Sequence, residues 1–144
     1  MTKGTIKCVG KGGTAKDFYY TFKPGIPDLI SGEIEEWSLK VYASTDHSDS
    51  TYVEVVAKRS GQERLRIDVI KNHGGDMYSA KGIPESVVAE LAKLTDLCVC
   101  SSSQEEPKFP NEGRTPQATN YWRRLECKGK AEYDKTTDVY TFIP

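Results

Sequence analysis

Residues 79–94, SAKGIPESVVAELAKL, place a glycine-bearing turn directly before an amphipathic pattern, and the fold prediction starts from them. Their apolar side chains recur at helical spacing, at Ile83, Val87, Val88, Leu91 and Leu94. ERLRIDVIK (63–71) before them and DLCVC (96–100) after them have the composition of strands. The order strand, turn, helix, strand predicts a βαβ unit whose two strands run parallel.

The first half of the chain is rich in strand-like runs separated by turn-forming residues. These runs predict a hairpin followed by an antiparallel meander, at 5–11, 17–24, 37–43, 51–59 and 63–71. In the last run Leu65, Ile67 and Val69 alternate with Arg66, Asp68 and Ile70, so we expect the first three on the apolar face. Residues 24–36 hold two prolines and two glycines and predict a loop.

The last third of the chain predicts a second helix and a closing hairpin. Thr115 has the properties of a helix N-cap, with Pro116 at the first helical position, and the helix should end near Cys127. Residues 130–134 and 139–143 are strand-like. The predicted fold class is therefore α+β: a mostly antiparallel mixed sheet with one parallel pair in a βαβ unit and two packed helices.

Length and composition favour one domain spanning residues 1–144. The apolar fraction of 37% and the charged fraction of 28% are typical of a soluble globular protein, and no apolar run is long enough to cross a bilayer. The first residues, MTKGTIKCVGKGG, lack the apolar centre of a secretory signal. We therefore expect a cytoplasmic protein with no membrane partner.

The cysteines and histidines do not predict a metal site. Cys98 and Cys100 are spaced C-x-C in an apolar stretch, where a strand would bury both on the same face. The two histidines, His47 and His73, lie in polar stretches, and no second ligand pair completes a tetrahedral set. The cysteines are too few and too scattered for a disulfide scaffold, so we expect reduced thiols and no metal.

The turn before the first helix has two interpretations. In a βαβ unit the helix N-terminus favours an anion, Gly82 permits close backbone approach, and Lys81 adds a positive charge. Pro84, however, has no N–H to donate, and Glu85 adds a negative charge. A proline followed by an acidic residue is also an ordinary way to begin a helix. The turn alone leaves phosphate binding and simple helix initiation both open.

Its neighbours add a family resemblance, which covers about residues 64–144. SAKGIPESVVAELAK resembles the acyl-CoA pyrophosphate loop of the Gcn5-related N-acetyltransferase (GNAT) family, with Lys81, Gly82 and Ile83 at its centre. CVCSSS and the helix TPQATNYWRRL follow in the family's order, and that helix resembles its A-x-x-[FY]-[YW]-x-x-L segment. Pro84 stands where the family has a second glycine, and Trp122 stands where many members have a tyrosine.

The resemblance implies an acyltransferase that moves an acetyl group from acetyl-CoA to a small-molecule or protein amine, or a divergent member that only binds. The implied cofactor-binding residues are Ser79, Ala80, Lys81, Gly82 and Ile83. The strand from Leu65 to Lys71 would align the pantetheine arm of the cofactor. The candidate catalytic groups, which would remove a proton from the amine, are Tyr121, Asp68 and Glu54.

Two other function classes remain open. The net charge of −1 argues against a surface that binds nucleic acid everywhere. The last helix and hairpin nevertheless resemble those of a winged-helix DNA-binding domain, with basic residues at Arg123, Arg124, Lys128, Lys130 and Lys135. That fold needs three helices, and only one strong helix precedes this one. The third class is a small interaction or inhibitor protein that docks through Phe18, Tyr19, Tyr20 and Phe22. Residues 101–113, polar and proline-containing, are a further candidate functional segment.

Overall fold

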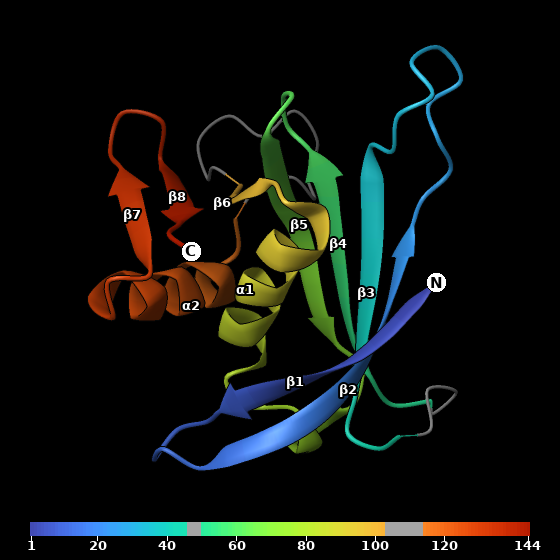
Figure 1. Ribbon diagram of the computed structural model, residues 1–144. Helices are drawn as coiled ribbons and strands as arrows, with labels where there is room; N and C mark the ends of the chain where they lie inside the picture. Colours follow the sequence, from blue (N-terminus) through green and yellow to red (C-terminus); the bar gives the residue numbers. More distant parts are fainter. Residues whose placement is uncertain (46–49, 103–113) are drawn as a thin grey trace.

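The computed structural model describes residues 1–45, 50–102 and 114–144. Their strands form one mixed sheet in the order β1-β2-β3-β4-β5-β6-β8-β7 (Figure 1). The strands are β1 (Thr2–Val9), β2 (Ala15–Pro24), β3 (Glu36–Tyr42), β4 (Val53–Arg59), β5 (Arg64–Asn72), β6 (Cys98–Ser101), β7 (Ala131–Asp134) and β8 (Val139–Phe142). The helices are the short 3-10 helix η1 (Gly75–Met77), α1 (Ile83–Thr95) and α2 (Pro116–Cys127).

The strand pairing confirms the predicted fold class. β1 to β5 pair antiparallel with their sequence neighbours, as the hairpin and meander predict. β5 and β6 are parallel and are joined through α1, which confirms the βαβ unit. β7 and β8 form the closing hairpin, and β8 returns to pair with β6. Residues 103–113, most of the predicted polar functional segment, lie outside the described residues, as does His47.

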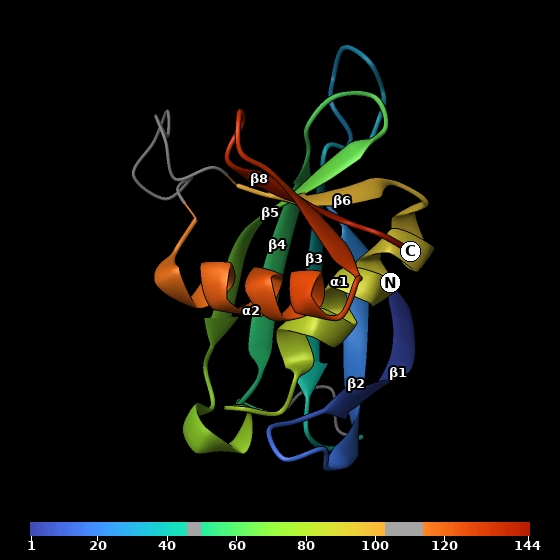
Figure 2. The same ribbon diagram turned by 90° about the vertical axis from the view of Figure 1, so that its left-hand side faces the viewer.

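One face of the sheet is apolar and carries both α-helices (Figure 2). Side chains of α1, α2 and all eight strands form a single core cluster, because alternate strand residues point to this face. Phe18, Tyr20 and Phe22 belong to that core and are therefore not available as a docking face. The opposite face carries polar residues such as Lys23, Lys40 and Glu54, and no described helix covers it.

The two α-helices begin where their capping residues predict. Thr115 is the N-cap of α2, and its hydroxyl accepts a hydrogen bond from the amide of Ala118 (3.1 Å), with Pro116 at the first position. Gly82 is the N-cap of α1 and has a left-handed conformation, with φ of 75°. Tyr121, Trp122 and Leu125 of α2 are buried, as their spacing predicts.

A β-bulge in β5 corrects the predicted alternation of that strand. Val56 of β4 pairs with Val69 and Ala57 pairs with Ile67, so Asp68 is an extra residue without a partner on β4. The extra residue reverses the faces beyond it. Ile70, and not Val69, packs against the core, because one inserted residue moves every later side chain to the other face.

Cys98 also departs from the prediction. Cys100 is buried, whereas Cys98 is exposed. Cys98 is the first residue of β6, directly after the chain leaves α1, so the core does not yet cover its side chain. In the described part of the chain, no helix has both the length and the apolar character required to cross a membrane.

Candidate functional site

A cavity of about 900 Å³ lies where the two parallel strands part. Arg64–Ile67 of β5 pair with Cys98–Ser101 of β6, and beyond this point β5 continues to Asn72 without β6 beside it. Ile67 to Ile70, on the continuing part of β5, line the cavity together with the start of α1 and the inner side of α2. The splayed strands, the helix N-terminus and α2 therefore enclose one space.

The turn before α1 forms one end of this cavity. Ala80 and Gly82 line it, and so do Val9, Gly10 and Lys11 from the end of β1, because the curled sheet carries β1 across the start of α1 (Figure 1). The Lys11 amide donates a hydrogen bond to the Ala80 carbonyl (3.0 Å). A Cβ atom at Gly82 would lie 2.1 Å from the Val9 carbonyl oxygen, so only glycine fits there.

The five predicted cofactor-binding residues do not all lie at the cavity. Ala80 and Gly82 border the cavity, whereas Ser79, Lys81 and Ile83 are not part of its lining. The Ser79 hydroxyl donates to the Gly75 carbonyl (3.2 Å), and the Ile83 side chain is in the core. Lys11, 70 positions earlier in the chain than Lys81, instead supplies a cation at this end of the cavity.

The first turn of α1 offers backbone donors together with one opposing charge. Within the described ranges, the amides of Gly82, Ile83 and Glu85 have no hydrogen-bond acceptor, as is usual at a helix start. Pro84 contributes no N–H, as the sequence analysis anticipated. The macrodipole and these amides favour an anion, whereas the Glu85 carboxylate opposes one.

Glu85 is a buried carboxylate on the cavity wall with one free oxygen. Its Oε1 accepts a hydrogen bond from Arg124 Nε of α2 (2.5 Å), and its side chain is 13% exposed. Its Oε2 is buried and has no hydrogen-bond partner among the described residues. Arg124 is 55% exposed at the cavity rim and so has room to turn toward a bound anion.

Tyr121 lines the same cavity, on the face of α2 that also buries Trp122. Burial raises the pKa of the Tyr121 phenol above its ordinary value, so the group stays protonated at neutral pH. Such a phenol is a weak acid that donates a hydrogen bond, and it does not act as a base. The environment of Tyr121 therefore does not suit its predicted role of removing a proton from the amine.

The other two candidate catalytic residues differ in position. Asp68, the bulged residue of β5, lines the cavity, but its carboxylate is ion-paired with Arg66 Nε (2.6 Å) and Lys58 Nζ (3.6 Å). Glu54 lies on β4 and lines a separate cavity on the polar face of the sheet. The structure therefore brings Tyr121 and Asp68 together and leaves Glu54 elsewhere.

Arg114 also lines the cavity, and the sequence analysis did not identify it as a site residue. Its side chain, 4% exposed, pairs with Asp138 (Nη2 to Oδ1, 2.9 Å) at the β7–β8 turn. It also donates to the Ser102 carbonyl (3.1 Å) and to the Thr119 hydroxyl of α2 (2.9 Å). One guanidinium thus ties the end of β6, the closing hairpin and α2 around the cavity, a role that no local sequence pattern indicates.

No protein-family model, curated protein or solved structure shows a significant match to this chain. The chemistry of the site is therefore argued from its own residues. Across residues 1–45, 50–102 and 114–144, no group of three or more His, Cys, Asp or Glu side chains is arranged to hold a metal ion.

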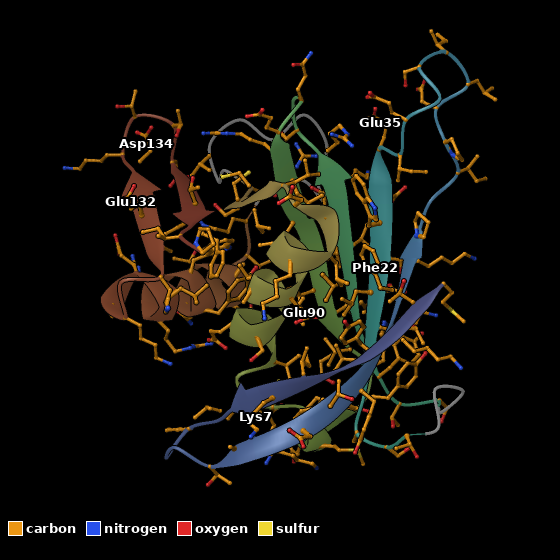
Figure 3. The ribbon with its side chains drawn as sticks, viewed as in Figure 1. Lys7, Phe22, Glu35, Glu90, Glu132 and Asp134 are labelled. Carbon is orange, nitrogen blue, oxygen red and sulfur yellow. The ribbon has the colours of Figure 1, made fainter. Side chains whose placement is uncertain are left out.

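We expect alkaline pH to destabilise the fold through its buried tyrosines. An unfolded tyrosine loses its proton near pH 10, whereas burial and the Glu90 carboxylate on α1 (Figure 3) raise the pKa of Tyr20 to about 12, and burial raises that of Tyr121. Because both folded pKa values are raised, this stabilisation is complete below about pH 10 and is lost as the pH rises through them. Urea unfolding between about pH 8 and pH 12 should show the loss, up to about 1.4 kcal/mol per pH unit for Tyr121. Tyr121→Phe should remove the part of this pH dependence that Tyr121 contributes. If the free energy of unfolding still fell as steeply with pH in this variant, the raised pKa of Tyr121 would be contradicted.

Proposed function

We propose that this protein binds acetyl-CoA in the cavity between β5, α1 and α2 and transfers the acetyl group to an amine. One observation carries the proposal: parallel strands part beside a helix N-terminus, with a cavity of about 900 Å³ at that point. Crevices at the carboxyl ends of parallel strands are common ligand sites, and this volume is in the range of cofactor pockets. The order of the elements from β5 to α2 is also the one that the resemblance to the GNAT family leads us to expect.

The lining of the cavity suits the parts of CoA. The turn at Gly82, with Lys11 beside it and Arg124 at the rim, would bind the pyrophosphate. Backbone groups of β5 beyond its last pair with β6 would bind the amides of the pantetheine arm, in the manner of an added strand. Apolar residues such as Ile67 and Ala118 would contact the alkyl segments of the arm.

In the proposed reaction the neutral amine attacks the thioester carbonyl carbon, and the carbon–sulfur bond then breaks. The Tyr121 phenol donates a hydrogen bond to the departing thiolate, and the thiolate takes the proton that the amine nitrogen loses, so the net products are an amide and free CoA. Holding both reactants in one enclosed site supplies most of the rate gain. The Trp122 indole has no hydroxyl group for this contact, and the adjacent phenol makes it.

The test is the affinity of CoA for the protein and two charge variants, measured by calorimetry and by thermal shift. Lys11→Glu should weaken binding and Glu85→Gln should strengthen it, each by about 3- to 10-fold, because one removes attraction at the pyrophosphate end and the other removes repulsion. Lys135→Glu, on the β7–β8 turn outside the cavity lining, is the matched control and should leave the affinity unchanged. Absence of CoA binding, or the same response in all three variants, would overturn the proposal.

One observation favours a second function, an interaction protein without chemistry. Three large apolar side chains on the loop between β2 and β3 are almost fully exposed, and isolated soluble proteins rarely present such a cluster at one tip. This observation is independent of the cavity and is developed next.

A further inference from the structure

The loop of residues 25–35, between β2 and β3, presents apolar side chains to solvent. Ile26, Leu29 and Ile30 are 89%, 100% and 98% exposed. The loop extends beyond the end of the sheet in both views, and Glu35 marks its base (Figures 1, 2 and 3). These side chains gain nothing from the hydrophobic effect in a single copy, whereas their burial in an interface would be favourable. We call residues 25–35 the apolar loop.

Hydrogen bonds hold the apolar loop in a defined shape. The Asp28 carboxylate accepts bonds from the amides of Ile30 (2.8 Å) and Ser31 (3.0 Å), and these backbone donors lower its pKa. The Gly32 amide donates to the Asp28 carbonyl (2.8 Å). At the base, Arg59 Nε donates to the Ile34 carbonyl (3.2 Å). A loop fixed in this way loses less conformational entropy on docking than a floppy one.

The charged side chains of the apolar loop are all acidic. Residues 25–35 include Asp28, Glu33 and Glu35 and no Lys or Arg, and Arg59 of β4 pairs with Glu35 at the base (3.9 Å). An acidic rim is repelled by the anionic surface of a membrane and attracted by a basic protein surface. The surface that fits the apolar loop is therefore a groove with lysines and some apolar lining.

Such a groove begins at the base of the same loop. It has a volume of about 820 Å³, lies on the sheet face that no described helix covers, and includes Pro24 and Gly25 at one end. Three lysines line it, Lys3, Lys23 and Lys40, and they outnumber the two acidic residues of its lining, Glu36 and Glu54. Trp37 and Tyr42 also border it, and the side chains of both are buried. We call this the lysine groove.

We propose that the protein forms a two-fold symmetric dimer in which the apolar loop of each copy lies in the lysine groove of the other. The loop and the groove adjoin on one surface. A two-fold axis beside the loop base therefore forms two identical loop–groove contacts, and no loop or groove is left over to bind a third copy. Each loop extends past the end of its own sheet, which lets it run along the partner's groove (Figure 1). The acidic side chains then face lysines, and the exposed apolar side chains become buried.

Analytical ultracentrifugation of the full chain over a wide concentration range tests the dimer. We expect the mass of a dimer, with weaker association at high salt. The double variant Leu29→Ser with Ile30→Ser should raise the dissociation constant by about 30-fold or more, as loss of central apolar anchors does. Lys23→Glu with Lys40→Glu should also dissociate the dimer. Met77→Ser, at an exposed apolar residue of η1, is the control and should leave it intact.

A monomer at every concentration, or a dimer that survives both double variants, would overturn the proposal. So would a monomer that floats with phosphatidylcholine vesicles only when Leu29 and Ile30 are intact, since the loop would then be a membrane anchor. Circular dichroism and thermal melting confirm that each variant is folded. The dimer is separable from the proposed acetyl-CoA site, because these variants leave the residues lining that cavity unchanged.

Discussion

Arg114→Met is expected to lower the free energy of unfolding by about 3 to 5 kcal/mol, because it removes the guanidinium that pairs with the buried Asp138 carboxylate. The Asp138 side chain is 10% exposed, and it also accepts a hydrogen bond from the Tyr133 hydroxyl (2.6 Å). The Arg114 guanidinium also lies over the Tyr140 ring, 5.1 Å from its centroid, so that contact is lost as well. Urea unfolding monitored by Trp fluorescence measures the change.

The matched variant replaces both charges. Arg114→Met combined with Asp138→Asn removes the carboxylate together with the guanidinium, and Asn tolerates the left-handed conformation of residue 138, with φ of 55°. This double variant should recover most of the stability that the single variant loses. Arg123→Met, at an exposed position on α2, should change stability by less than about 0.5 kcal/mol. A single variant as stable as the wild type would contradict the role assigned to the buried pair.

The second large effect is expected from Gly82→Ala, which should cost about 2 to 5 kcal/mol. Its φ of 75° is unfavourable for any residue with a Cβ, and the added atom would lie 2.1 Å from the Val9 carbonyl oxygen. Gly12→Ala is the matched control, because Gly12 has φ of 88° but nothing within 4 Å of an added Cβ. Gly12→Ala should therefore lose only the free energy that an alanine costs at positive φ, roughly 1 to 2 kcal/mol.

The difference between these two variants measures how tightly β1 packs on the start of α1. Equal losses in chemical denaturation would show that Val9 moves aside freely. Because of the same crowding, any substitution of Gly82 lowers the stability of the fold whether or not a ligand binds at this turn. Charge changes at Lys11 and Glu85 are therefore the sharper probes of the cavity.

Much of the fold could be predicted because its signals are local. The change from strand-like alternation to helical spacing after residue 82 predicts the βαβ unit, and Thr115 with Pro116 predicts the start of α2, as the structure confirms. The β-bulge could not be predicted in this way. Asp68 pairs with Arg66 and Lys58, and the second of these contacts depends on how β4 and β5 align.

The candidate site was predicted less completely, because its walls come from distant parts of the chain. The glycine turn was visible as a local motif, and Ala80 and Gly82 do border the cavity. Lys11 reaches the same place only because the sheet curls, and Arg114 takes its position from the closing hairpin. Glu54 has the chemistry of a base, but the alternation of β4 places it on the opposite face of the sheet.

The contact between β1 and α1 also has a consequence for how the protein folds. The Ser86 hydroxyl donates a hydrogen bond to the Lys7 carbonyl across 79 residues of sequence, and the cavity additionally needs α2, which follows β1, β5 and α1 in the chain. Contacts between such distant segments form slowly, because closing a long loop costs entropy before the contacts contribute. A nascent chain can therefore pair β1 to β5 on the ribosome, but it acquires the pocket only after α2 has emerged.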